Sequence, residues 1–127
     1  IKVIDDTYNA CPDSMRSALN TLTATKGIRK VAVLGDMYEL GPDSGMFHKE
    51  IGRYAGEKKI DLLVAIGKDA EGAREILSPE QVKYFPGKEA FIESMEDMIF
   101  PGDVVLVKAS RGMEMEKIVK KIFEDKE

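Results

Sequence analysis

Short apolar runs alternate with longer stretches of helical periodicity along the whole chain. The runs IKVI (1–4), RKVAVLGD (29–36), DLLVAIG (61–67), QVKYF (81–85) and DVVLVKA (103–109) are rich in Val, Ile and Leu, and each is predicted to be a strand. The segments VAVLG, LLVAIG and VVLVK are almost continuously apolar, which is typical of central strands buried on both faces. QVKYF is more polar, and we therefore expect it at an edge of the sheet.

The segments between these runs carry apolar residues at three- and four-residue steps, the pattern of amphipathic helices. The clearest stripe lies between residues 12 and 25 and consists of Met15, Ala18, Leu19 and Leu22. Pro12 suits the first turn of this helix, where the N–H that proline lacks would have no partner. Further helices are predicted at residues 45–59, 69–77, 87–99 and 113–125.

Strands that alternate with helices at this spacing are typical of βαβ units. We predict an α/β fold, a three-layer α/β/α sandwich with a mostly parallel sheet of five to six strands. No internal repeat, low-complexity tract or linker interrupts the pattern, so residues 1–127 are predicted to form one domain. The chain begins directly with a strand, as we expect of a domain cut from a longer polypeptide.

The composition narrows the class of protein. A formal net charge of −4 and a pI near 5.2 argue against a dedicated nucleic-acid binder, which is usually basic. Cys11 is the only cysteine, so no internal disulfide can form. The apolar runs are too short to span a bilayer, and the start does not read as a signal peptide. A cytoplasmic protein without membrane insertion is expected.

Polar residues follow the predicted strands at the ends where ligands bind to open parallel sheets. The strand ends are DDTYN (5–9), GDM (35–37), GKD (67–69) and KASRG (108–112). Residues of this kind also cap helices and form turns. SRG can bind an anion or merely cap a helix. Lys108 is expected to extend its ammonium group to solvent. His48 is expected to be structural, and Cys11 is expected to be a small buried or half-buried filler.

Several catalytic motifs are absent from the sequence. There is no phosphate-binding loop of the form G-x-x-x-x-G-K-[ST], no G-x-G-x-x-G after a strand, and no His/Cys spacing typical of zinc. A receiver domain of two-component signalling fits in size, but its acceptor aspartate would end the third strand, where Asp61 instead begins it. A stand-alone module that binds a nucleotide or a small carboxylate at the strand ends is a further alternative.

Three longer segments together resemble the C-terminal domain of the Mur ligase family. They are DDTYNACPDSMRSAL (5–19), VAVLGDMYELG (31–41) with His48 beyond it, and GDVVLVKASRGMEME (102–116). Their order and spacing are similar to the family pattern over about residues 2–120. Within the family, the chain most resembles the members that join D-alanyl-D-alanine to UDP-N-acetylmuramoyl-tripeptide in peptidoglycan synthesis.

The resemblance implies a Rossmann-like domain that works with two others: one for the UDP-sugar and a central ATPase domain. The complete ligase uses ATP and Mg²⁺ to form an acyl-phosphate on the tripeptide, which the amine of D-alanyl-D-alanine attacks. The phosphate loop and most Mg²⁺ ligands of these enzymes belong to the central domain. The resemblance therefore implies no catalytic residue and no metal site in this chain, which alone is expected to be inactive.

The DDTYN segment resembles the part of the family domain that closes over the nucleotide. By this resemblance Asp6 accepts hydrogen bonds from the ribose hydroxyls, Tyr8 lies against the adenine or ribose, and Asn9 adds polar contacts. The chain departs from the family pattern at two positions. Cys11 replaces the asparagine of YNANP, and Ala109 replaces the first glycine of KGSRG.

The other two segments resemble the parts of the domain that face the incoming dipeptide. Ser110 and Arg111 are expected to take its carboxylate, together with backbone N–H groups of the last helix. Asp36 is expected to help orient the amine, and Met113 to contact the dipeptide. His48 is expected to brace the loop that follows Asp36.

Overall fold

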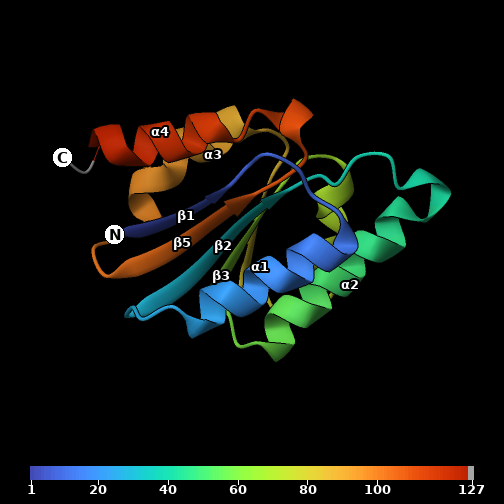
Figure 1. Cartoon of the computed structure of the whole chain (residues 1–127), viewed down its shortest axis with the longest axis horizontal. Helices are drawn as coiled ribbons and strands as arrows, with labels where there is room; N and C mark the ends of the chain where they lie inside the picture. Colours follow the sequence, from blue (N-terminus) through green and yellow to red (C-terminus); the bar gives the residue numbers. More distant parts are fainter. Residues whose placement is uncertain (126–127) are drawn as a thin grey trace.

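A five-stranded sheet, in which every pair of neighbouring strands is parallel, forms the middle layer of the computed structural model, which describes residues 1–125 (Figure 1). The strands, in the spatial order β1-β5-β2-β3-β4, are β1 (Lys2–Asp6), β5 (Asp103–Lys108), β2 (Arg29–Gly35), β3 (Leu62–Ile66) and β4 (Val82–Phe85). The α/β prediction is confirmed, and QVKYF contributes the edge strand β4 as expected.

Helices cover both faces of this sheet, as Figure 1 shows. On one face lie α1 (Pro12–Ala24) and α2 (Ser44–Glu57), and on the other lie α3 (Lys88–Ser94) and α4 (Glu116–Asp125). The described residues also contain four short 3-10 helices: η1 (Gly41–Asp43), η2 (Asp69–Glu75), η3 (Met95–Asp97) and η4 (Arg111–Met113). Among residues 1–125, no helix has the length and apolar character needed to cross a bilayer.

The structure corrects three predicted helices. Residues 69–75 form a 3-10 helix that packs tightly on α2, where a Cβ atom on Gly52 would lie 2.9 Å from that of Ala73. The helix predicted over 87–99 is α3 followed by η3. The last helix begins at Glu116 instead of residue 113, because η4 and the left-handed Glu114, with a φ of 53°, come first.

Side chains alternate between the two faces along each strand. In β5, Val104 and Leu106 belong to the apolar cluster under α1 and α2, whereas Val105 and Val107 belong to the cluster under α3 and α4. The same alternation places the next residue, Lys108, on the α1 side. Whether a residue occupies an odd or an even position along a strand therefore decides which face it lies on, and so which polar side chains can meet at the strand ends.

A buried ion pair holds the amino edge of the sheet. Asp103 is 3% exposed, and its carboxylate accepts hydrogen bonds from Nε of Arg29 at 3.0 Å and Nη2 of Arg29 at 2.9 Å. The amide of Phe100 donates to the same carboxylate at 2.8 Å. The pair therefore ties the start of β5 both to β2 and to the turn that precedes it.

We predict that Asp103→Ala lowers the free energy of unfolding by about 3 kcal/mol, because it removes the partner of a partly buried guanidinium group. Urea unfolding at neutral pH measures the change. Asp97→Ala, an exposed carboxylate on the nearby η3, is the control and should change stability by less than about 0.5 kcal/mol. Equal effects of the two substitutions would contradict the prediction.

Candidate functional site

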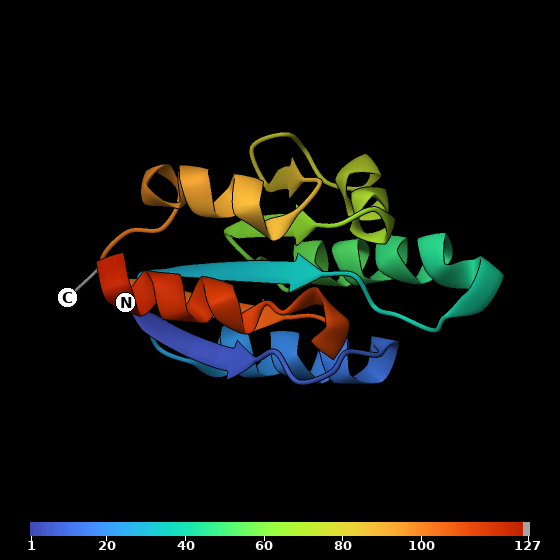
Figure 2. The same ribbon diagram turned by 90° about the horizontal axis from the view of Figure 1, so that it is seen from above.

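The carboxyl ends of all five strands meet at one edge of the sheet. In Figure 2 the arrowheads of β1 (blue), β2 (cyan) and β3 (green) point toward the same side of the molecule. The register pairs Asp6 with Lys108 and Gly35 with Ile66, so the loops that leave these strands are neighbours. This carboxyl edge carries the polar segments that the sequence singled out, and two grooves lie on it.

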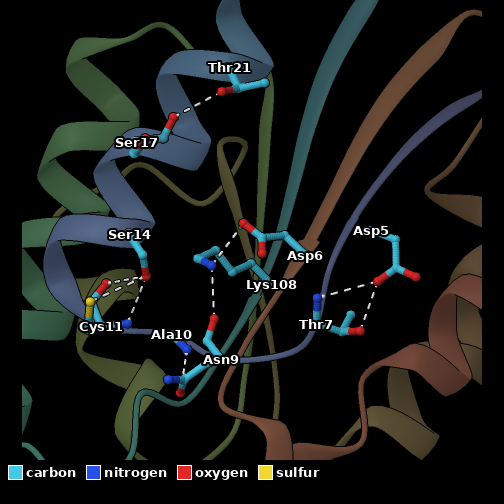
Figure 3. A network of polar contacts seen from close by, with 10 residues as sticks. All are labelled: Asp5, Asp6, Thr7, Asn9, Ala10, Cys11, Ser14, Ser17, Thr21 and Lys108. Atoms are coloured by element: carbon cyan, nitrogen blue, oxygen red, sulfur yellow. Dashed lines mark hydrogen bonds and ion pairs between the residues drawn. The ribbon is translucent and has the colours of Figure 1, made fainter.

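The first groove has a volume of about 420 Å³ and is lined by Asp5, Asp6, Thr7, Tyr8, Arg111 and Glu116. The Tyr8 ring is 72% exposed, and the guanidinium carbon of Arg111 lies 5.2 Å from its centroid, a cation–π contact. Asp5 fixes the turn before the ring, because its Oδ1 accepts the Thr7 hydroxyl at 2.8 Å (Figure 3). The groove thus offers a flat aromatic face beside a carboxylate.

Lys108 lies beneath this loop and makes two contacts, which Figure 3 shows. Its Nζ donates to Oδ2 of Asp6 at 2.8 Å and to the carbonyl oxygen of Asn9 at 2.9 Å. The expectation that Lys108 reaches solvent is wrong. It ends a central strand, and the loop from β1 to α1 covers its ammonium group. The Asn9 side chain instead accepts the N–H of Ala10 at 2.9 Å.

Cys11 stands where the family pattern has asparagine, at the N-cap of α1. The expected burial of Cys11 is wrong, because the side chain is exposed at the start of the helix. Its backbone N–H donates to the Ser14 hydroxyl at 3.0 Å (Figure 3). The Ser14 hydroxyl also hydrogen-bonds the thiol and lowers the pKa of Cys11. The start of α1 is therefore stabilised through Ser14, and the asparagine is not needed for that purpose.

The second groove has a volume of about 270 Å³ and lies between the ends of β2, β3 and β4 and the η4 turn. The residues that line it include Asp36, Tyr38, Lys68, Lys88, Gly112 and Met113. A Cβ atom on Gly112 would lie 2.7 Å from the Tyr38 ring, so the absence of a side chain there lets the two loops approach. This groove combines two lysines with the buried carboxylate of Asp36.

Asp36 is buried at the end of β2 and holds the neighbouring turn. Its Oδ1 accepts the N–H of Ala70 at 2.8 Å. Gly67, with a φ of +112°, passes so close that a Cβ atom there would lie 2.6 Å from the Asp36 carboxylate. Burial is the main cause that raises the pKa of Asp36, against the lowering effect of the Ala70 hydrogen bond.

The loop after Asp36 is held from both sides by buried side chains. Nε2 of His48 accepts the N–H of Met37 at 3.0 Å, and its Nδ1 lies 2.7 Å from the carbonyl oxygen of Ser44. This pattern requires the neutral tautomer with the proton on Nδ1. On the other side, the hydroxyl oxygen of Ser110 accepts the N–H of Tyr38 at 2.7 Å.

The structure distributes the sequence-predicted residues over two places. Asp6, Tyr8 and Arg111 line the first groove, whereas Asp36 and Met113 line the second. Ser110 and His48 are buried behind the loops and line neither groove, and the Asn9 side chain turns to its own backbone. The charged groove residues to which sequence reasoning gave no ligand role are Asp5, Glu116, Lys68, Lys88 and Glu89.

The sequence indicates the position of one of the two lysines but not of the other. Lys68 directly follows a predicted strand, so its place at the carboxyl edge was available from the sequence. Lys88 does not follow its strand directly. It begins α3, and the turn between β4 and α3 brings it to the groove. Within residues 1–125 no group of three or more His, Cys, Asp or Glu side chains is placed to hold a metal ion.

Comparison with known proteins identifies similar sequences that cover most of the chain. The family model described as "Mur ligase, glutamate ligase domain" matches residues 1–111. The UDP-N-acetylmuramoyl-tripeptide–D-alanyl-D-alanine ligase of Bacillus subtilis is 38% identical over 129 residues, covering 98% of this chain and 28% of that protein. The enzyme of the same name from Escherichia coli is 34% identical over 125 residues, covering 97% of this chain and 27% of that protein.

Solved structures give the same result. A crystal structure of MurF from Acinetobacter baumannii superposes with a TM-score of 0.87 at 36% identity, over 96% of this chain and 27% of that one. MurF ligase from Thermotoga maritima in complex with ADP superposes with a TM-score of 0.77 at 30% identity, over 94% of this chain and 27% of that one. The chain therefore spans little more than a quarter of the length of these relatives.

We predict that the Asp36 carboxylate makes stability depend on pH. Its pKa is raised in the folded protein, so between its ordinary pKa and the raised one the folded state binds more protons than the unfolded chain. The free energy of unfolding therefore rises as the pH falls through this window. Asp36→Asn keeps an oxygen for the Ala70 N–H but removes the charge.

Urea unfolding of both proteins from about pH 7 to about pH 4 measures this effect. We expect the wild-type protein to gain stability relative to Asp36→Asn as the pH falls. A difference between the two proteins that stays constant over this range would contradict the prediction.

Proposed function

The chain belongs to the Mur ligase family, and from this premise we propose that it is the C-terminal domain of an ATP-dependent ligase that joins D-alanyl-D-alanine to UDP-N-acetylmuramoyl-tripeptide. In this proposal the domain closes over the nucleotide and positions the dipeptide. The observation that carries it is the place of η4 between the two grooves: Arg111 lines the first groove, and Gly112 and Met113 line the second. One short turn thus lines both grooves, and in the proposal it lies next to both ligands.

The first groove suits a nucleoside. The exposed Tyr8 ring gives adenine or ribose a flat surface with a polar tip. The Asp6 side chain, 43% exposed, is a hydrogen-bond acceptor for ribose hydroxyls. The related enzyme from Thermotoga maritima was crystallised with ADP, which supports a nucleotide as the ligand.

The second groove suits the dipeptide, which carries an amine at one end and a carboxylate at the other. Asp36 and Met113 line it, and Arg111 stands beside it on η4. In the proposal, adenine takes the place of Arg111 on the Tyr8 ring, and the released guanidinium binds the dipeptide carboxylate. His48 and Ser110 act indirectly, because they hold the Met37–Tyr38 segment from behind.

Positioning is the chemical contribution that these residues can make. Amide formation needs the amine within about 3–3.5 Å of the acyl carbon, with water excluded. A mobile domain with both grooves on one edge achieves this by closing on the domain that holds the acyl-phosphate. The resemblance to the family implies that Mg²⁺ is held mainly by the central domain.

We predict that the 127-residue chain folds cooperatively but neither hydrolyses ATP nor forms the amide bond, because its sequence has no phosphate-binding loop. Thermal unfolding followed by circular dichroism tests the first part. Phosphate release in the presence of ATP, Mg²⁺, D-alanyl-D-alanine and the UDP-linked tripeptide tests the second. Sustained turnover by this chain alone would show that the catalytic groups lie within it.

We predict that Arg111→Ala in the full-length ligase raises the KM for D-alanyl-D-alanine about 10- to 100-fold, because one charge-assisted contact to the dipeptide carboxylate is lost. The KM for ATP should change much less. Arg74→Ala is a matched control, since the guanidinium of Arg74 lies 5.1 Å from the Tyr84 ring, outside both grooves. A larger effect on ATP than on the dipeptide would assign Arg111 to the nucleotide.

A further inference from the structure

Lys108 is unusual among the lysines that the structure describes, because it is only 2% exposed and ends an apolar central strand. Lysine is almost never fully buried unless its charge is paired, and burying a charge costs free energy. An apolar residue at this position would pack the core without that cost. The burial of the ammonium group must therefore be explained by its contacts.

Its contacts are with the two ends of the loop that carries Tyr8. Nζ of Lys108 lies 2.8 Å from Oδ2 of Asp6 and 2.9 Å from the carbonyl oxygen of Asn9 (Figure 3). Asp6 is the direct neighbour of Lys108 in the register of β1 with β5, so the sheet itself sets their separation. One buried cation thus fixes both ends of the 6–9 segment.

The consequence for Asp6 is an oriented carboxylate. One of its oxygens is bound by Lys108, while the side chain stays 43% exposed on the wall of the first groove. An exposed carboxylate without such a partner would rotate freely among its rotamers. The salt bridge removes that freedom before a ligand arrives, which lowers the entropic cost of binding.

We propose that Lys108 is the positioning residue of the nucleotide groove. It does not touch the nucleotide but holds the Asp6 carboxylate in the orientation that recognises the two ribose hydroxyls. This inference rests on the proposed function, because it takes a nucleoside as the ligand of the first groove.

Loss of a ribose hydroxyl measures this role directly. A carboxylate held in place distinguishes a ribose from a deoxyribose, because the missing hydroxyl leaves it without a charge-assisted hydrogen bond. A carboxylate that moves freely loses most of this discrimination. A purely structural lysine would affect stability and all substrates alike, and would leave the discrimination unchanged.

The experiment uses the full-length ligase that contains this domain, with ATP, 2′-deoxy-ATP and 3′-deoxy-ATP as nucleotides. We expect the wild-type enzyme to disfavour at least one deoxynucleotide about 10-fold in kcat/KM. In Lys108→Met, the KM for ATP should rise about 10-fold, and the discrimination should fall below about twofold. The KM for D-alanyl-D-alanine should stay within about twofold of the wild-type value.

Two further variants make the result specific. Lys108→Arg keeps a cation and should retain most of the discrimination. Lys30→Met is the matched control: Lys30 contacts the carbonyl oxygens of Leu22 and Thr23 at 3.4 and 3.5 Å, toward the opposite edge of the sheet. It should leave the kinetics unchanged. If Lys108→Met fails to fold, Lys108→Gln takes its place under the same criteria, because glutamine is polar but neutral and one atom shorter than lysine, so it cannot restore the salt bridge to Asp6.

The outcomes separate the inference from the proposed function. A wild-type enzyme without ATP-dependent ligation overturns the proposed function and this inference with it. Ligation with no ribose discrimination in the wild type, or with full discrimination in Lys108→Met, overturns the inference alone. An equal rise in the KM of ATP and of the dipeptide also overturns it, because that result describes a structural lysine.

Discussion

The uniform direction of the strands is the constraint on which the rest of this structure depends. Every neighbouring pair is parallel, so each connection must cross back over a face of the sheet, and the helices cover both faces as a result. The carboxyl ends then meet at a single edge. Polar residues that are far apart in the sequence, such as Asp6 and Lys108, become neighbours through strand register alone.

Buried polar contacts hold the loops at this edge in place. Lys108 anchors the loop after β1, Asp36 anchors the turn after β3, and His48 with Ser110 anchors the loop after β2. Among the described residues, no buried side-chain nitrogen or oxygen lacks a partner. The edge therefore combines fixed loops with a few exposed groups, which is the arrangement expected of a preorganised binding site.

Much of the fold was predictable from the sequence, because continuous apolar runs and helical periodicity indicate directly which residues are buried and in which kind of element. The polar run that became β4 was placed correctly at an edge for the same reason. The exact ends of helices were less predictable: η4 and the left-handed Glu114 depend on how the last loop packs. The burial of Lys108 was missed, since it depends on a loop that covers the strand end in three dimensions.

The motifs predicted two sets of ligand-binding residues at the carboxyl edge, but not how the loops divide that edge into two grooves. That division depends on close approaches, such as Gly67 against Asp36 and Gly112 against Tyr38, which a linear sequence does not display. Asn9 illustrates a similar limit. The sequence predicts a ligand contact for its side chain but does not indicate that the side-chain oxygen accepts the N–H of Ala10 or that the backbone carbonyl oxygen accepts from Lys108.

The contact between Arg111 and Tyr8 determines how strongly the two proposed ligands influence each other. At an exposed site such a cation–π contact is worth about 0.5–1 kcal/mol, which is small beside the free energy of nucleotide binding. Adenine can therefore displace Arg111 from the ring at little cost. By reciprocity, a dipeptide carboxylate that draws Arg111 away makes the ring available to adenine to the same extent.

The size of this coupling follows from the free energy of the contact. Because 1.4 kcal/mol corresponds to a factor of ten, the contact between Arg111 and Tyr8 alone couples the two ligands by about two- to fivefold. Such a coupling favours an order of binding without imposing one, and strict order would have to come from closure of the domains.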